Sequence, residues 1–153
     1  MTWTVRTNTR LAANGPWEQT VASAQIKRDL NGCLLTERFT GTRQGRPFQA
    51  LSMFAWNNNS QKLQQVFSDS EHGPLVFYEG VESGAEILVD LDWKLPDGRS
   101  VKLRRAYFNL AKDSFTLESR RSTDGGKTWD TTGRAEYRRD AATKTAAGKT
   151  PKF

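Results

Sequence analysis

EILVDLDWKLPDGRSVKLRRAY, residues 86–107, is the stretch that decides the fold. Its first half alternates apolar Ile87, Val89, Leu91, Trp93 and Leu95 with polar Asp90, Asp92 and Lys94. A period of two places successive side chains on opposite faces of a β-strand. After the Pro-Asp-Gly turn of residues 96–98, the same alternation resumes with Val101, Leu103 and Tyr107 against Lys102 and Arg104. The stretch therefore predicts two half-buried strands that pair antiparallel.

Similar strand-like segments follow one another along the rest of the chain, separated by clusters of Asn, Asp, Gly and Pro. The predicted strands are residues 3–10, 17–28, 33–40, 47–56, 62–69, 75–81, 85–95, 100–110, 115–121 and 133–139. The Asn31-Gly32 pair predicts a tight two-residue hairpin. Residues 61–66 could be helical on composition alone, but no convincing helix interrupts the series.

The connections between these segments are all of hairpin length, which favours an up-and-down meander over a Greek-key sandwich. A sheet of about ten strands exposes two long edges unless its first and last strands pair. We therefore predict an all-β fold, a single up-and-down antiparallel β-barrel of about ten strands over residues 1–139. The composition of residues 140–153 predicts a disordered, basic C-terminal tail.

The chain has 153 residues, a formal net charge of +6 and a single cysteine, Cys33. One cysteine excludes an intramolecular disulfide, so we expect a reducing, cytoplasmic environment. Residues 1–10 lack the apolar run of a signal peptide and no later run reaches membrane-spanning length, so we expect no membrane association. The arginine pairs at 104–105, 120–121 and 138–139 should put one cation on each strand face, and we expect no nucleic-acid partner.

The order of several short motifs resembles one protein family. The motifs are Trp3, Gly15-Pro16-Trp17, NGCLLTE at 31–37, GRPF at 45–48, Ser68-Asp69, FYEG at 77–80, DSFT at 113–116, STDGGKTW at 122–129 and EYRR at 136–139. In this order they resemble a family of small bacterial lipocalin-like barrels classed as a domain of unknown function. The resemblance implies a calycin-type barrel and brings no established activity. Those barrels usually begin with a short lead-in segment and Gly-x-Trp, of which only Trp3 is present. We therefore expect this barrel to lack the lid or plug that such a segment would supply.

Few residues support a specific chemistry. Residues 122–129 fit the Asp-box of sialidase propellers, but the motif occurs once, which predicts a structural hairpin capped by Asp124. His72 is the single histidine, which excludes a multi-histidine metal site and favours an exposed loop position over a haem ligand or a general base. Cys33 is predicted as a small core residue. Without a Gly-rich phosphate loop, a Cys-x-x-Cys pair or a serine nucleophile elbow, we expect no metal, no cofactor and no assigned catalytic residue.

The more informative residues are polar side chains that share strand parity with apolar ones. Glu37, Asp69, Glu79, Arg105 and Arg139 have this property. If these faces look inward, carboxylates and guanidinium groups meet inside the barrel, where an unpaired charge costs several kcal/mol. The purely structural interpretation is an internal salt-bridge network, or a β-bulge that turns a residue outward. The functional interpretation is a binding site in which Trp3, Trp56, Phe67, Phe77, Trp93 and Tyr107 enclose an apolar body.

The predicted ligand-binding residues are Trp3, Glu37, Phe39, Phe67, Asp69, Phe77, Glu79, Trp93, Arg105, Tyr107 and Tyr137. Our first hypothesis is non-catalytic binding of a small hydrophobic or amphipathic molecule, with a polar group of the ligand at Arg105. The second is an enzyme of unknown class that uses Glu37 or Asp69 as general base and Arg105 to stabilise negative charge. The third is an interaction protein whose outer face forms a homodimer.

Overall fold

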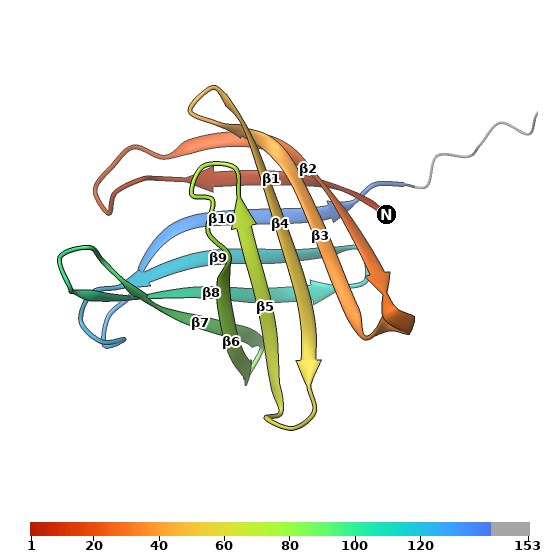
Figure 1. The fold of residues 1–153 in the computed structure, drawn as a ribbon. Helices are drawn as coiled ribbons and strands as arrows, with labels where there is room; N and C mark the ends of the chain where they lie inside the picture. The colour runs from red at the N-terminus through yellow and green to blue at the C-terminus, as the bar shows by residue number, and fades with distance from the viewer. Residues whose placement is uncertain (142–153) are drawn as a thin grey trace, which may run out of the picture.

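The computed structural model describes residues 1–141 and is built from ten antiparallel strands (Figure 1). The strands are β1 (Thr2–Thr9), β2 (Glu18–Asp29), β3 (Leu34–Arg43), β4 (Arg46–Asn57), β5 (Lys62–Asp69), β6 (Val76–Ser83), β7 (Glu86–Lys94), β8 (Ser100–Ala111), β9 (Ser114–Ser122) and β10 (Asp130–Arg139). The helical structure described is a three-residue 3-10 turn, η1 (Leu30–Gly32). No helix within residues 1–141 is therefore long and apolar enough to cross a membrane.

Each strand pairs with its neighbour in the sequence, and β1 also pairs with β10, which closes the sheet. The closing register places Trp3 opposite Arg139 and Val5 opposite Tyr137. Figure 1 shows these first and last strands lying side by side. The predicted up-and-down barrel is confirmed, and closure satisfies the backbone groups that an open sheet would leave along its two edges.

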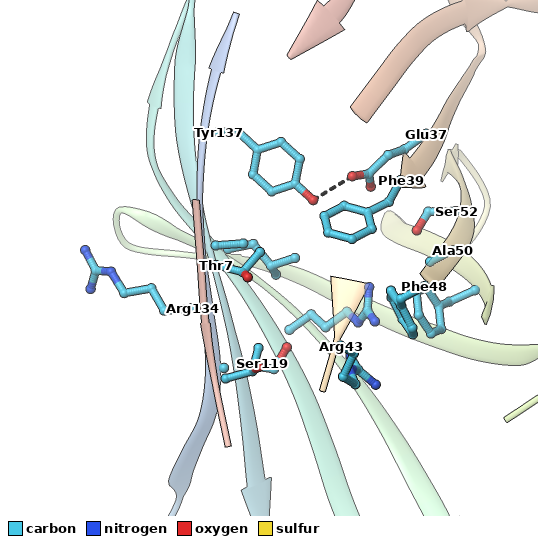
Figure 2. Close-up of a pocket in the computed structure, with 16 residues that line it drawn as sticks. Thr7, Glu37, Phe39, Arg43, Phe48, Ala50, Ser52, Ser119, Arg134 and Tyr137 are labelled. Carbon is cyan, nitrogen blue, oxygen red and sulfur yellow. Dashed lines mark hydrogen bonds between the residues drawn. The ribbon is translucent and has the colours of Figure 1, made fainter. Parts of the chain in front are cut away.

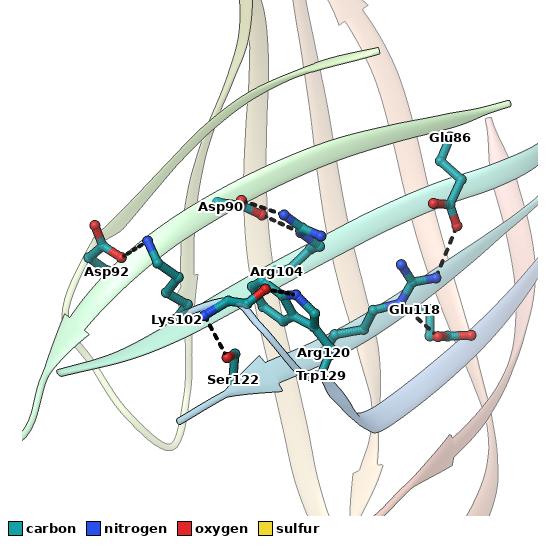
Figure 3. Close-up of polar contacts among 10 residues, drawn as sticks. Glu86, Asp90, Asp92, Lys102, Arg104, Glu118, Arg120, Ser122 and Trp129 are labelled. Carbon is teal, nitrogen blue, oxygen red and sulfur yellow. Dashed lines mark hydrogen bonds and ion pairs between the residues drawn. The ribbon is translucent and has the colours of Figure 1, made fainter. Parts of the chain in front are cut away.

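The alternating stretch contributes to β7 and β8, with Asp90, Asp92, Lys102 and Arg104 on the outer face of the barrel (Figure 3). Asp90 lies opposite Arg104 in the register, and its carboxylate accepts two hydrogen bonds from that guanidinium at 2.7 and 2.9 Å. Asp92 lies opposite Lys102 and accepts a hydrogen bond from its Nζ at 2.8 Å. Cross-strand pairing of opposite charges therefore stabilises the wet face, while Val89 of the same strand is fully buried.

Two clusters of buried side chains form the core. The first comprises Trp3, Val5, Ala22, Ala24 and Tyr137, and the second Tyr78, Val89 and Tyr107. Phe115 and Leu117 of β9 pack against both clusters and join them into one core. Burial of each large apolar side chain stabilises the fold by about 1.5–3 kcal/mol.

The barrel turns a corner at β6, where a glycine is required. In Figure 1, β3, β4 and β5 run steeply across the front, whereas β8, β9 and β10 lie across the back. Gly80 of β6 pairs with Val89 of β7, and a Cβ added to it would lie 1.7 Å from the carbonyl oxygen of Leu88. Only a residue without a side chain permits this close approach of the two strands.

The connection between β9 and β10 has the hairpin structure predicted for residues 122–129. Hydrogen bonds from the Thr128 hydroxyl, from backbone N–H groups and from Ser122 lower the pKa of Asp124 to about 2. The ring N–H of Trp129 donates to the Gly126 carbonyl at 3.1 Å, and the Arg104 guanidinium carbon lies 4.1 Å from the Trp129 ring centroid (Figure 3). This motif is therefore a local brace for the outer face of β8.

Two local expectations are wrong. The predicted two-residue hairpin at Asn31-Gly32 is a longer connection, residues 30–33, because the left-handed conformation already begins at Leu30 (φ 50°) and continues at Asn31 (φ 56°). Cys33 lies in that connection, ahead of β3, and is exposed instead of contributing to the core. The strand predicted for residues 62–69 is confirmed as β5, although the composition of residues 61–66 would also allow a helix.

The predicted C-terminal tail falls mostly on residues 142–153, which lie outside the described residues. Asp140, at its start, is held to β1. The backbone N–H of Asp140 donates to the Thr2 carbonyl at 3.0 Å, and the Thr4 hydroxyl donates to the Asp140 carboxylate at 2.7 Å. The contacts that close the barrel therefore continue one residue beyond β10.

Replacement of Gly80 tests the corner. Gly80→Ala should lower the free energy of unfolding by about 2–3 kcal/mol or more, because its methyl group would force β6 away from β7. Urea denaturation measures the change, with Ser83→Ala at the exposed end of the same strand as the matched control. If both variants were as stable as the wild type, the close approach at Gly80 would be refuted.

Candidate functional site

A group of polar side chains lies inside the barrel, where strand parity places them among apolar neighbours. Glu37 of β3 lies between inward-facing Leu35 and Phe39, and Arg105 of β8 lies between Leu103 and Tyr107. Because side chains two residues apart share a face, each strand that delivers apolar residues to the interior also delivers one charge.

Glu37 is 7% exposed and accepts a hydrogen bond from the Tyr137 hydroxyl at 2.6 Å (Figure 2). Burial raises the pKa of Glu37 above its ordinary value, although the Tyr137 hydrogen bond and the charge of Arg105 act in the opposite direction. Burial also raises the pKa of Tyr137 well above its ordinary value, so the phenol keeps its proton and acts as the donor. Glu37 is thus a buried carboxyl whose neutral form is favoured.

A second polar chain crosses the interior beside it. The Tyr107 hydroxyl donates to Oε1 of Gln65 at 3.0 Å, and Nε2 of Gln65 donates to the Ser52 hydroxyl at 3.3 Å. Gln65 is fully buried, and burial raises the pKa of Tyr107. These bonds satisfy the polar groups of three strands, which is the condition for tolerating them in a core.

Arg105 packs its guanidinium against aromatic rings. Its guanidinium carbon lies 3.9 Å from the Phe67 ring centroid and 5.2 Å from that of Tyr78, distances at which the ring faces attract a cation. Burial alone would lower the pKa of Arg105, but the hydroxyls of Tyr107 and Tyr78 and the carboxyl of Glu37 raise it above its ordinary value.

The Glu37–Tyr137 pair and the Tyr107–Gln65–Ser52 chain are here called the polar layer. Two interior spaces lie on either side of it. The first, here called the large cavity, has a volume of about 710 Å³ and is bounded by Trp3, Ile26, Leu35, Phe54, Leu63, Ile87 and Phe115, with Glu37 and Tyr107 also in its wall. The second, here called the arginine chamber, consists of adjoining spaces of about 120 and 430 Å³ that share Arg43, Phe67, Arg105 and Ser119. Glu37 borders both the large cavity and the smaller part of the arginine chamber.

The walls of the large cavity are held by aromatic packing. Phe115 stacks on Tyr137 with centroids 4.2 Å apart and contacts Trp3 edge-on at 5.4 Å. Phe54 meets Tyr107 edge-on at 5.9 Å. Such contacts fix the rings in place, so the cavity wall is preformed.

Comparison with protein families assigns this barrel to a family. A family model described as "Protein of unknown function (DUF1579)" matches residues 2–139, which include all ten strands. The chain belongs to the DUF1579 family. The resemblance seen in the sequence is therefore confirmed as far as a barrel family of unknown function.

Two solved structures are similar to this DUF1579 barrel. An S-type phycobiliprotein lyase, CPES from Guillardia theta, is 11% identical, with 93% of this chain and 88% of that chain covered and a TM-score of 0.57. A redesigned β-barrel is 12% identical, with 92% and 90% covered and a TM-score of 0.45. The likeness to the lyase shows the fold alone. No curated protein sequence matches the chain.

Most of the predicted site residues of this DUF1579 chain border interior space. The large cavity and the arginine chamber are bordered by Trp3, Glu37, Phe39, Phe67, Asp69, Trp93, Arg105, Tyr107 and Tyr137. They do not form one site, because Trp3 and Tyr107 border the large cavity, whereas Phe67 and Trp93 border the arginine chamber. Trp56, expected to enclose a ligand, is 47% exposed at the end of β4.

The predicted inward orientation of Phe77 and Glu79 is wrong. Phe77 is 48% exposed, and the Glu79 carboxylate accepts hydrogen bonds from Lys62 and Gln64 on the outer face. Tyr78 is the buried residue of this segment. Aromatic residues occupy both parities here, so alternation alone could not decide which one faces the core.

Asp69 and His72 stand at the open side of the arginine chamber. Burial alone would raise the pKa of Asp69, but hydrogen bonds from the backbone of His72 and Glu71 and from the His72 ring lower it below its ordinary value. The His72 side chain is 70% exposed. As predicted, His72 is an exposed loop residue. Its ring hydrogen-bonds to Asp69, and the Asp69 carboxylate caps the backbone of the loop.

The interior residues absent from the predicted site include Ser52, Phe54, Gln65 and Tyr78. Gln65 had a usable signal, because it shares parity with Leu63 and Phe67 on β5. Tyr78 had no such signal, because the adjacent Phe77 is an equally good aromatic candidate for the inward-facing position. Burial of a neutral amide is also less conspicuous in a sequence than burial of a charge.

Glu37→Gln should remove a pH dependence of stability. A raised pKa means that the folded protein holds the Glu37 proton more tightly than the unfolded chain, so the free energy of unfolding falls as pH rises above the ordinary value of 4.5. The fall amounts to about 1.4 kcal/mol for each unit by which the pKa is raised. Glutamine has no proton to lose, and the variant should lack this decline.

Urea unfolding between about pH 5 and pH 8 measures the effect. Glu79→Gln is the matched control, because Glu79 lies on the outer face and its pKa is lowered by its hydrogen bond from Gln64. Parallel pH profiles for wild type and Glu37→Gln would contradict a raised Glu37 pKa.

Proposed function

We propose that this barrel binds a small, largely apolar molecule in the large cavity and does not transform it chemically. The observation that carries the proposal is the cavity itself, about 710 Å³ inside a closed sheet. Sites for small molecules occupy roughly 300–1,000 Å³ and are lined mostly by apolar and aromatic side chains. The Ile26, Leu63 and Phe115 side chains give the large cavity that lining.

An unfilled apolar space opposes stability, which supports a function for it. Protein interiors are normally packed as densely as organic crystals, and empty volume forfeits dispersion contacts. Here the aromatic walls are braced against one another instead of collapsing inward, as the Phe115–Tyr137 stack shows. A ligand with an apolar body would supply the contacts that the side chains leave unmade.

Polar groups at both limits of the large cavity would orient the ligand. At its inner limit, Glu37 and Tyr107 place a carboxyl and a hydroxyl in the wall. At its mouth, Lys27 and Arg28 are exposed, and the Arg139 guanidinium carbon lies 5.1 Å from the Trp3 ring centroid. A ligand that carries one polar end beside an apolar body fits this distribution best.

Filling the cavity should weaken binding. Ile87→Trp places an indole in the large cavity and should weaken binding of an uncharged apolar fluorophore, N-phenyl-1-naphthylamine, by about tenfold or more, about 1.4 kcal/mol. Fluorescence enhancement on titration measures the affinity. Val81→Trp is the matched control, because Val81 is 46% exposed on the outer face.

The proposal requires that Val81→Trp bind the fluorophore like the wild type. Equal affinities for wild type and Ile87→Trp, or no binding by the wild type, would refute the large cavity as the ligand site.

A further inference from the structure

Arg105 lies on the side of the polar layer opposite the large cavity. It borders both spaces of the arginine chamber, as do Arg43, Phe67 and Ser119. Figure 2 shows the smaller of these spaces, with Arg43 and Ser119 at one side and the Glu37–Tyr137 pair at the other. Arg134, which borders the same space, points away from it.

The guanidinium of Arg105 lacks the carboxylate partner that the partly buried Arg104 and Arg120 have. Arg104 makes a two-bond contact with Asp90, and Arg120 contacts both Glu86 and Glu118 at 2.9 and 2.8 Å (Figure 3). Within residues 1–141, no carboxylate oxygen lies within 4.0 Å of the Arg105 guanidinium. Burying a cation without such a partner costs several kcal/mol, so the position is expensive unless something else neutralises it.

The two acidic residues that border the chamber hydrogen-bond to other groups. Glu37 accepts the Tyr137 hydroxyl, and its burial disfavours its charged form. Asp69 borders the larger space but accepts hydrogen bonds from the backbone of Glu71 and His72 and from the His72 ring. Arg105 therefore faces its chamber as a cation that rests against tyrosine hydroxyls and aromatic rings and makes no ion pair of its own.

We propose that Arg105 binds the carboxylate of a small organic acid in the arginine chamber, a site separate from the large cavity. A guanidinium presents a planar fork of donors that matches a carboxylate, and Arg stays charged at any physiological pH. The Phe67 and Tyr78 rings hold this fork in place, and the Ser119 hydroxyl borders the same space as a further donor. Arg43, which pairs with Glu71 at 3.0 Å, is a second cation in the wall.

The rest of the chamber suits the organic part of the acid. Val76, Leu91, Trp93 and Leu103 border the larger space, so an aromatic or aliphatic body beside the carboxylate would contact apolar side chains. Arg121, exposed at the end of β9, also borders this space and adds positive potential at the opening. A bare inorganic anion would leave these apolar contacts unused.

Binding of 2-naphthoate, with its uncharged methyl ester for comparison, tests the site. By isothermal titration calorimetry, the wild type should bind 2-naphthoate and bind the ester at least tenfold more weakly. Arg105→Met should lose at least tenfold in affinity for 2-naphthoate. Arg38→Met, which removes an exposed cation that borders neither space of the chamber, should leave that affinity unchanged.

Two further measurements separate this site from a structural role and from the large cavity. Without ligand, Arg105→Met should unfold in one cooperative transition and keep the far-UV circular dichroism of the wild type, so that a loss of 2-naphthoate binding reports on the site and not on the fold. Arg105→Lys keeps the charge but not the fork, and should fold and bind 2-naphthoate several-fold more weakly. Ile87→Trp should bind 2-naphthoate like the wild type.

Four outcomes would overturn the proposal: no binding of 2-naphthoate by the wild type, equal binding of acid and ester, wild-type affinity in Arg105→Met or Arg105→Lys, or loss of 2-naphthoate binding in Ile87→Trp. The last would place the acid in the large cavity. The proposed function stands or falls separately, because it is judged by the uncharged fluorophore.

Discussion

The pairing of β1 with β10 is the constraint on which the rest of this structure depends. It joins segments more than a hundred residues apart and brings Tyr137 within hydrogen-bond distance of Glu37. Without this pairing, the inward faces of the ten strands would be open to water, and the polar layer would be solvent-exposed. Closure converts the same residues into buried groups whose charges and hydrogen bonds must be satisfied internally.

Closure also divides the basic residues into two populations. In the pair Arg104–Arg105, strand parity directs one side chain outward and the other inward. Arg104 meets Asp90 on the adjacent strand, and its charge is balanced. Arg105 shares its space with the Phe67 and Tyr78 rings. The excess positive charge of the chain is thus concentrated, in part, where a ligand rather than solvent can meet it.

Period-two alternation and turn signals were sufficient for the fold, because the strands are half-buried and their connections are short. They were also sufficient for Glu37 and Arg105, each a charge flanked by apolar residues of the same parity. They failed at β6, where Phe77 and Tyr78 offer equivalent aromatics to either face and the corner at Gly80 depends on a contact with β7. The interior is divided into two spaces by the way side chains from several strands pack together. The residue pattern of a single strand does not predict this packing.

Amide hydrogen exchange, followed by NMR, tests closure most directly. If β1 and β10 pair as described, amides of residues 3–9 and 133–139 that donate across this seam should be protected as strongly as those of β7, β8 and β9, because all are released by the same cooperative unfolding. Rapid exchange confined to β1 and β10 would contradict the account, since it would mean that the sheet opens at this seam and that the interior is not enclosed.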